Sequence, residues 1–172
     1  TAASVVSSGK FSFRYGRVEI RAKIPTGRGT WPALWMLGEN KQGVGWPKCG
    51  EIDLMENVGF DPEKLHFTVH TGAFNHVKKT GVGRAITVPR VFDDFHAYGL
   101  LWTADRMEFF FDGKKVHEFL NDGKGVDHWP FDAPVYLLMN FAVGGDWGGQ
   151  KGIDETIFPQ EFRVDYVRVW QR

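Results

Sequence analysis

The sequence has little cysteine, no excess of either charge and no long hydrophobic run. Cys49 is the only cysteine among 172 residues, which excludes an intrachain disulfide and leaves the redox compartment open. Lys and Arg together number 21, as do Asp and Glu. This balance argues against nucleic acid and gives no sign of attraction to an anionic membrane. No apolar run is long enough for a transmembrane helix, and no signal-peptide pattern is visible.

Helical periodicity is almost absent, and apolar residues alternate with polar ones instead. Residues 18–24 and 65–70 alternate clearly, 100–119 reads as strand, turn, strand, turn, strand, and 135–143 and 162–170 read as two more strands. Gly-rich loops are expected at 25–30, 38–50 and 144–156, with a short helical turn near 153–158. Many short strands between Gly-rich turns predict an all-β sandwich or barrel, formed as one domain over residues 1–172.

Aromatic residues are abundant, with 7 Trp, 15 Phe and 4 Tyr. Aromatic rings favour strands and also provide flat faces on which sugars or bases stack. Packing in the core is the favoured reading for any single tryptophan. Trp147 is the exception, because a large ring in the Gly-rich run GGDWGG has little local reason to be there unless it contacts a ligand.

Three carboxylates lie close together in residues 50–59, GEIDLMENVG. In a regular strand Glu51 and Asp53 share one face, and Glu56 points to the other. A β-bulge at Leu54–Met55 would shift the phase by one residue and return Glu56 to the first face. Three acids on one face repel one another and lose hydration, so a purely structural role is disfavoured.

Three readings of these acids remain open from the spacing alone. They could act as paired catalytic carboxyls, bind Ca²⁺ or Mg²⁺ through oxygen, or lie on a solvated strand face. The apolar spacers Ile52, Leu54 and Met55 disfavour the solvated face. The aromatic residues Trp31, Trp35, Trp46, Trp102 and Trp147, with His70 and Asn140, favour a carbohydrate site beside catalytic acids.

The chain resembles glycoside hydrolase family 16 over nearly its whole length. GEIDLMENVG is similar to the family's active-site signature in the form with one extra residue, here Met55, and this form is typical of laminarinases, agarases and carrageenases. Other similar segments are GKFSFRYGRVEIRAKIP, GTWPALWMLG, HTGAFNH, FHAYGLLWT, FFFDGKKV, LLMNFAVGG and FRVDYVRVWQ. HTGAFNH and WPALWML look most like the laminarinases.

The resemblance implies a jelly-roll β-sandwich of two curved antiparallel sheets with a concave substrate cleft. It implies a retaining endo-hydrolase of laminarin-type β-1,3-glucans. Glu51 matches the nucleophile, Glu56 the general acid/base and Asp53 the carboxylate that assists them. Positions that line the cleft in the family are matched by Trp31, Trp35, His70, Asn140 and Trp147.

Several further expectations rest on the resemblance. No cofactor is expected for catalysis, but Asp165 matches a position where many of these enzymes bind a structural Ca²⁺. We expect a secreted monomer whose partner is a polysaccharide. The N-terminal strands usual in the family are absent from the sequence.

Two other functions stay open. The same fold and chemistry could act on mixed-linkage β-glucan or on a marine galactan, although a sulfated substrate would call for clustered Arg or Lys, and the basic residues are scattered. A glucan-binding domain without turnover is the second alternative. The presence of both Glu51 and Glu56 argues against it, because binding alone needs neither.

Overall fold

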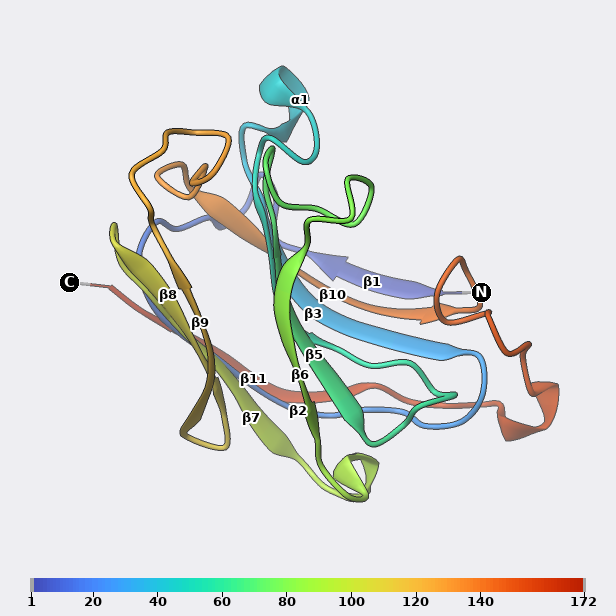
Figure 1. Ribbon diagram of the computed structural model, residues 1–172. Helices are drawn as coiled ribbons and strands as arrows, with labels where there is room; N and C mark the ends of the chain where they lie inside the picture. The colour runs from blue at the N-terminus through green and yellow to red at the C-terminus, as the bar shows by residue number, and fades with distance from the viewer. Residues whose placement is uncertain (1, 172) are drawn as a thin grey trace.

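Alternating apolar and polar residues build two antiparallel sheets in the computed structural model, which describes residues 2–171 (Figure 1). Within these residues, sheet A has the spatial order β1, β10, β3, β4, β5, β6, spanning Ala3–Val6, Val135–Val143, Thr30–Gly38, Glu51–Glu56, Lys64–His70 and Val82–Thr87. Sheet B has the order β11, β2, β7, β8, β9, spanning Arg163–Trp170, Gly16–Lys23, His96–Trp102, Arg106–Phe111 and Lys114–Leu120. The predicted all-β sandwich is confirmed.

The main core lies between the two sheets. Ile20 of β2, Phe67 of β5 and Phe109 of β8 are fully buried there. The rings of Phe67 and Phe109 meet edge to face, with their centroids 6.4 Å apart, and so join sheet A to sheet B. Trp102 is also fully buried in this core, where its ring packs against Phe13. The favoured interpretation of a single tryptophan as a core residue is confirmed for Trp102, which does not join the aromatic surroundings of the acids because its strand parity turns it inward.

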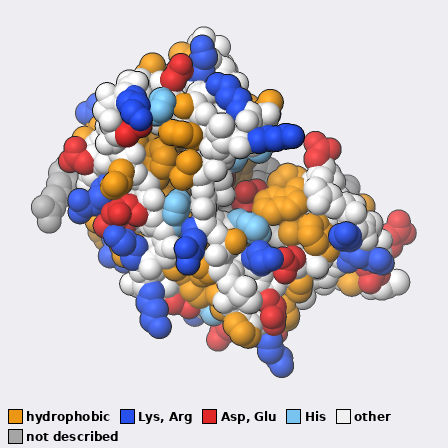
Figure 2. Space-filling model, in the orientation of Figure 1, with side chains coloured by type: hydrophobic (Ala, Val, Ile, Leu, Met, Phe, Trp, Pro, Cys, Tyr) orange, Lys and Arg blue, Asp and Glu red, His pale blue; other side chains and the backbone are white. Residues whose placement is uncertain are grey.

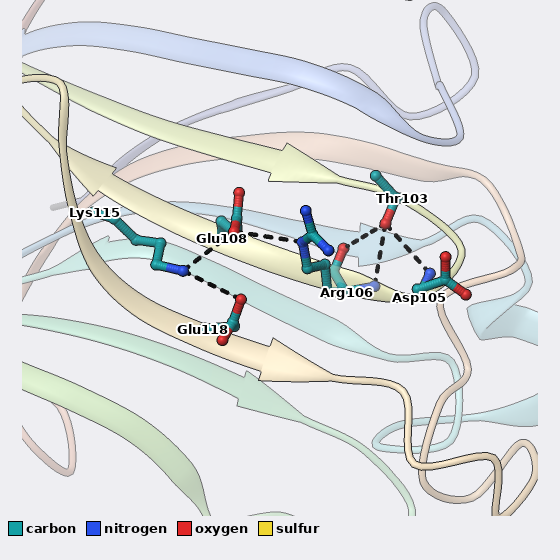
Figure 3. Close-up of polar contacts among 6 residues, drawn as sticks. All are labelled: Thr103, Asp105, Arg106, Glu108, Lys115 and Glu118. Carbon is teal, nitrogen blue, oxygen red and sulfur yellow. Dashed lines mark hydrogen bonds and ion pairs between the residues drawn. The ribbon is translucent and has the colours of Figure 1, made fainter.

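The outer face of sheet B is polar. Figure 3 shows Glu108 between Arg106 and Lys115, at 3.4 Å and 3.2 Å, and Lys115 also reaches Glu118 at 3.2 Å. The hydroxyl of Thr103 accepts a hydrogen bond from the backbone N–H of Arg106 at 3.2 Å and closes the turn between β7 and β8. Exposed ion pairs of this kind contribute little to stability, so this face mainly keeps the sheet solvated.

Three short helices interrupt the strands of the described chain. The predicted helical turn near 153–158 is confirmed by the 3₁₀ turn η2 at Glu155–Ile157. The other two are α1 at Lys41–Val44, inside the predicted loop 38–50, and η1 at Val91–Asp93. No helix among residues 2–171 has both the length and the apolar content needed to cross a membrane.

A second, smaller apolar cluster lies on the outer face of sheet A. Leu37, Tyr136 and Leu138 of the sheet pack there against Cys49, and Trp35 and Trp46 lie at its edge. The segment between β3 and β4, which carries α1, therefore folds over one end of this face. Burial raises the pKa of the Cys49 thiol, as expected for a cysteine that packs rather than reacts.

One side of the sandwich remains open among the described residues. Val164 and Val167 of β11 pair with the inward-facing Ala22 and Ile20 of β2, yet they are 38% and 36% exposed. Val5 of the edge strand β1 is 63% exposed. The expectation that strands usual in the family are missing from the sequence is not tested by this arrangement and stays a prediction.

The two faces of the β8–β9 hairpin should respond differently to mutation. Phe109→Ala should lower the free energy of unfolding by about 3–5 kcal/mol, because it leaves a cavity between the sheets. Lys115→Ala on the solvated face should leave the urea midpoint nearly unchanged. Urea unfolding followed by fluorescence measures both variants, and equal losses would contradict the assignment of inner and outer faces.

Candidate active site

Strand β4 carries the predicted irregularity. Leu34 and Trp35 are adjacent in β3, yet they pair with Met55 and Asp53 of β4, so Leu54 is the extra residue between them. The pairing of β4 with β5 shifts in the same interval, between Asp53 and Glu56. The bulge predicted at Leu54–Met55 is therefore confirmed on both sides of the strand.

The bulge separates apolar from acidic side chains. Leu54 and Met55 are consecutive, yet both are fully buried in the main core. Glu51, Asp53 and Glu56 lie on the opposite, outer face of sheet A, where their partners come from β3, β5 and the segment before β4. Figure 2 shows a hollow in the surface with acidic side-chain atoms at its floor, beside a hydrophobic patch and histidine side chains.

Gly50 makes the sharp entry into β4 possible. Its φ of +78° lies in the left-handed region, and a Cβ at this position would lie 2.7 Å from the ring of Phe131. Both features require glycine. The chain therefore turns from the covering segment into β4 immediately before Glu51.

Each of the two glutamates accepts one hydrogen bond from an indole. Trp46 Nε1 donates to Glu51 Oε2 at 2.9 Å, and Trp31 Nε1 donates to Glu56 Oε1 at 3.0 Å. A single neutral donor fixes the orientation of a carboxyl without neutralising it. The remaining oxygens of both glutamates are left available to other partners.

Asp53 lies deepest and is 3% exposed. His70 Nε2 lies 3.4 Å from Asp53 Oδ2 and 3.7 Å from Glu51 Oε1, so the imidazole faces both carboxyls. Within the described chain, Asp53 Oδ2 and His70 Nδ1 are buried polar atoms without a hydrogen-bond partner. A buried carboxylate oxygen without a partner is costly, so Asp53 favours a bound proton at this position.

Burial raises the pKa of all three carboxyls. It raises the pKa of Glu51 to about 8, with the Asp53 charge adding to the rise and the charge of His70 and the Trp46 hydrogen bond opposing it. Burial, then the Glu56 charge, raises the pKa of Asp53 well above its usual value. Burial also raises the pKa of Glu56, against the hydrogen bond from Trp31 and the charge of His70. The cluster therefore retains protons at a pH where isolated carboxyls are ionised.

Aromatic rings border the acids on two sides. Trp147 packs edge to face on Trp31 with centroids 5.8 Å apart, and His66 packs edge to face on Trp147 at 4.8 Å. Near Glu51, His76 lies 5.2 Å from the Trp46 ring. Flat rings beside carboxyls suit a carbohydrate, whose C–H faces stack on them.

The residues predicted to line a cleft come together on this face. Trp31 and Trp35 project from β3, His70 from β5 and Asn140 from β10, and Trp147 follows β10. Trp35 Nε1 donates to Asn140 Oδ1 at 2.7 Å, which fixes two of these side chains against each other. Their roles toward a substrate remain predictions.

Trp46 was grouped with the acids by residue type but was not predicted to line the cleft, and His66 and His76 were not predicted at all. Trp46 lies in the irregular segment before β4, where no periodicity indicates direction. His66 shares the strand parity of His70 and alternates with buried Leu65 and Phe67, so the alternation did carry a signal for it. His76 lies in the loop after β5 and gives no such signal.

Asp165 lies away from the acids, at an irregularity of β11 in sheet B. Its Oδ2 accepts a hydrogen bond from Arg21 at 2.7 Å. Calcium takes six to eight oxygen ligands, and an adjacent guanidinium repels a cation. The contact with Arg21 therefore argues against the expected calcium site, which stays a prediction.

The acids offer too few ligands for a typical Ca²⁺ or Mg²⁺ site. Donor atoms of Glu51, Asp53 and His70 lie within 4.8 Å of one another, close enough to share an ion. Two carboxylates and one imidazole are fewer ligands, and less oxygen-rich, than Ca²⁺ or Mg²⁺ requires. Paired carboxyls with indole donors suit acid–base and nucleophilic chemistry better.

Comparison with known proteins decides the family. The sequence profile described as glycosyl hydrolases family 16 matches residues 1–168. The chain belongs to this family. A β-glucanase from Rhodothermus marinus is 50% identical to it, over 99% of this chain and 62% of the relative. The solved laminarinase from Rhodothermus marinus has a TM-score of 0.94 at 48% identity, over 97% of this chain and 69% of that one.

Relatives named for different polymers match the chain. A keratan-sulfate endo-1,4-β-galactosidase from Sphingobacterium multivorum is 38% identical, over 99% of this chain and 40% of the relative. The chain thus spans less than two thirds of the length of these two curated relatives. Membership of the family fixes the fold, while the substrate is a matter for proposal.

The raised pKa of Glu51 predicts a pH-dependent effect of Glu51→Gln on stability. An acid whose folded pKa is about 8, against 4.5 unfolded, loses native-state stability as the pH rises from 4.5 through 8. The amide does not titrate, so Glu51→Gln should raise the melting temperature at pH 8 to 9 and have little effect at pH 4. Glu118→Gln on the solvated face is the control. Equal effects of Glu51→Gln at both pH values would contradict the shift.

Proposed function

We propose that the protein hydrolyses internal β-1,3 linkages of laminarin-type glucans, with retention at the anomeric carbon. The observation that carries the proposal is the placement of Glu51, Asp53 and Glu56 on one face by the bulge in β4. Retaining hydrolysis needs one ionised and one protonated carboxyl on either side of the scissile bond. Two indole-oriented glutamates on one strand support this division of roles.

In the first step, an oxygen of ionised Glu51 attacks the anomeric carbon. The bond from that carbon to the glycosidic oxygen breaks, and Glu56 gives its proton to the departing oxygen. Burial raises the pKa of Glu56 and so favours its protonated form before the step. A charged Glu51 beside it would act in the same direction. The product is a glycosyl ester of Glu51 and a shortened glucan.

In the second step, Glu56 acts in reverse. Once the charge of Glu51 is consumed in the ester, no neighbouring nucleophile charge repels an ionised Glu56, so its carboxylate can accept a proton from water. The oxygen of that water attacks the anomeric carbon, and the ester bond breaks. Glu51 returns as a carboxylate and Glu56 is again protonated.

Asp53 would keep Glu51 ionised by carrying a proton itself. Burial is greatest at Asp53, so a proton held by the cluster is best placed there. A neutral Asp53 adds no repulsion to a charged Glu51, so a proton on Asp53 favours the ionised nucleophile. We assign Asp53 and the facing His70 to orienting Glu51.

The choice of β-1,3-glucan rests on the relatives, because a β-glucanase and a laminarinase are about half identical to this chain. The keratan-sulfate galactosidase keeps a galactose-containing polymer as an alternative to be tested. Sulfate groups would need Arg or Lys nearby. The residues that border the acids are instead tryptophans and histidines.

We also propose that the protein works outside the cell as a monomer. A glucan polymer is too large to reach an enzyme inside the cell intact, so secretion follows from the proposed substrate. Catalysis by carboxyls alone needs no cofactor. A binding domain without turnover remains the rival, and it gives no reason for two oriented glutamates and a buried aspartate.

Incubation with laminarin should shorten the chains rapidly before any glucose appears. Glu51→Gln should abolish hydrolysis and preserve oligosaccharide binding, because an amide has the shape of a carboxylate but is not a nucleophile. Chromatography of products and calorimetric binding measure the two effects, with Glu118→Gln as the control. Near-full activity of Glu51→Gln would exclude Glu51 as the nucleophile. Faster cleavage of keratan sulfate, agarose or mixed-linkage glucan than of laminarin would contradict the proposed β-1,3-glucan specificity.

Proton NMR of the first products tests retention. Attack by Glu51 followed by water predicts that new reducing ends appear in the β-anomer and only later mutarotate. This outcome requires the carboxyls of Glu51 and Glu56 to lie about 5–5.5 Å apart, whereas about 6.5–9.5 Å leaves room for a water. Initial appearance of the α-anomer would show inversion and would remove the ester intermediate from the mechanism.

A further inference from the structure

The Gly-rich segment 144–152 crosses the face that carries the acids. It begins after β10, and the order of sheet A places β3 and β4 between β10 and β5. Neighbouring strands lie about 4.8 Å apart, so the distance from β10 to β5 is about 14 Å. Trp147 nevertheless contacts His66 of β5. The segment lies against β3, and the ring of Trp147 therefore reaches across β4 near the end where Glu56 lies.

Most hydrogen bonds of this segment are internal or reach only the segment before β3. Gly149 N donates to Gly145 O at 3.0 Å, and Gly144 N donates to Gly29 O at 2.8 Å. The backbone also packs closely on Trp31, since a Cβ at Gly148 would lie 2.8 Å from the Cβ of Trp31. These contacts hold the segment to β3. Toward β5, its contact is made by Trp147.

His66 provides the contact on the far side. It pairs directly with Glu56 across β4 and β5, and its ring meets the Trp147 ring edge to face with centroids 4.8 Å apart. Burial, together with the charge of Lys64, lowers the pKa of His66, and Asp61 opposes this. The imidazole is therefore neutral at neutral pH and packs as an aromatic ring.

These contacts form a continuous enclosure around one carboxyl. Trp31 donates its indole N–H to Glu56, Trp147 packs on Trp31, and His66 packs on Trp147 from the neighbouring strand. Glu56 thus contacts the Trp31 indole on β3 directly, and its pairing partner on β5, His66, closes the chain of rings through Trp147. Loss of the His66 ring would open this enclosure on the β5 side and let water reach Glu56.

We propose that His66 is a positioning residue that holds Trp147 and segment 144–152 over Glu56 and so keeps the general acid shielded from water. The catalytic part of this inference rests on the proposed function, because it takes Glu56 as the acid. The structural part, that His66 holds the segment, stands without it.

Exposure of Glu56 to water should change the pH profile of activity. The titratable groups facing Glu56 are Glu51 and Asp53 from β4 and His70 and His66 from β5, while β3 contributes the neutral Trp31. Their charges do not change when a neutral His66 is replaced by alanine. Burial is the first cause that raises the pKa of Glu56, so exposure lowers that pKa and moves the alkaline limb of activity to lower pH.

The test compares three variants with the wild-type protein. His66→Ala removes the ring, and His66→Phe keeps an aromatic ring that can pack on Trp147. His117→Ala is the matched control: His117 is a partly buried histidine of β9 in sheet B, where it packs on Phe109 and its pKa is also lowered by burial. The measurements are hydrogen exchange of residues 144–152 without substrate, and kcat/KM on laminarin as a function of pH.

We expect faster exchange in residues 144–152 for His66→Ala, and rates close to wild type for the other two variants. We expect the alkaline limb of His66→Ala to move down by about one pH unit, which is about a tenfold loss of kcat/KM above that limb. Restoration of both properties in His66→Phe would support the proposal and show that the loss is not one of folding.

Unchanged exchange in His66→Ala would overturn the proposal, because Trp147 would then be held by other contacts. Faster exchange with an unmoved alkaline limb would overturn the link between the segment and the acid. If the wild-type protein cleaves no glucan at all, the proposed function fails, while the exchange measurement still decides whether His66 holds the segment.

Discussion

One extra residue in β4 is the constraint on which the site depends. A regular strand from Glu51 to Glu56 would direct Glu56 between the sheets, where an unpaired carboxylate costs several kcal/mol. The bulge lets Leu54 and Met55 enter the core together and leaves all three acids outside it. The bulge therefore fills the core with two apolar side chains on one face and gathers the three carboxyls on the other. Bulges beside active sites often redirect side chains in this way.

The environment of the acids is set by elements distant in sequence. The cluster of Leu37, Cys49 and Tyr136 holds the segment before β4 against sheet A and so places Trp46 on Glu51. Trp31 of β3 orients Glu56. Burial of three carboxyls opposes folding at alkaline pH, and the large core between the sheets offsets that cost.

Much of this arrangement could be predicted from the sequence, because strand parity is a local property. The alternation in 18–24 and 65–70 predicted which residues face the core, and parity within residues 50–59 predicted both the bulge and the shared face of the acids. The same parity rule applied to 65–70 places His66 on the face of His70. His66 was not predicted because the family-like segment HTGAFNH begins at His70.

Other features have no local signal. Trp46 and His76 lie in irregular segments, whose direction depends on tertiary packing. Strand β6 is short and mostly exposed, so its sequence VGRAIT shows no clear alternation of burial. Trp102 was grouped with the acids by residue type alone, and the pairing of β7 in sheet B places it in the core instead.

The most direct test of the account is the titration of the carboxyl carbons of Glu51, Asp53 and Glu56 by ¹³C NMR in the protein without substrate. A buried, coupled cluster predicts that none of the three titrates in the usual carboxyl range and that Glu51 has its midpoint at about 8. Independent midpoints near 4 for all three would mean that the acids are solvated and separate, and would contradict the central claim that the bulge gathers them into one buried group.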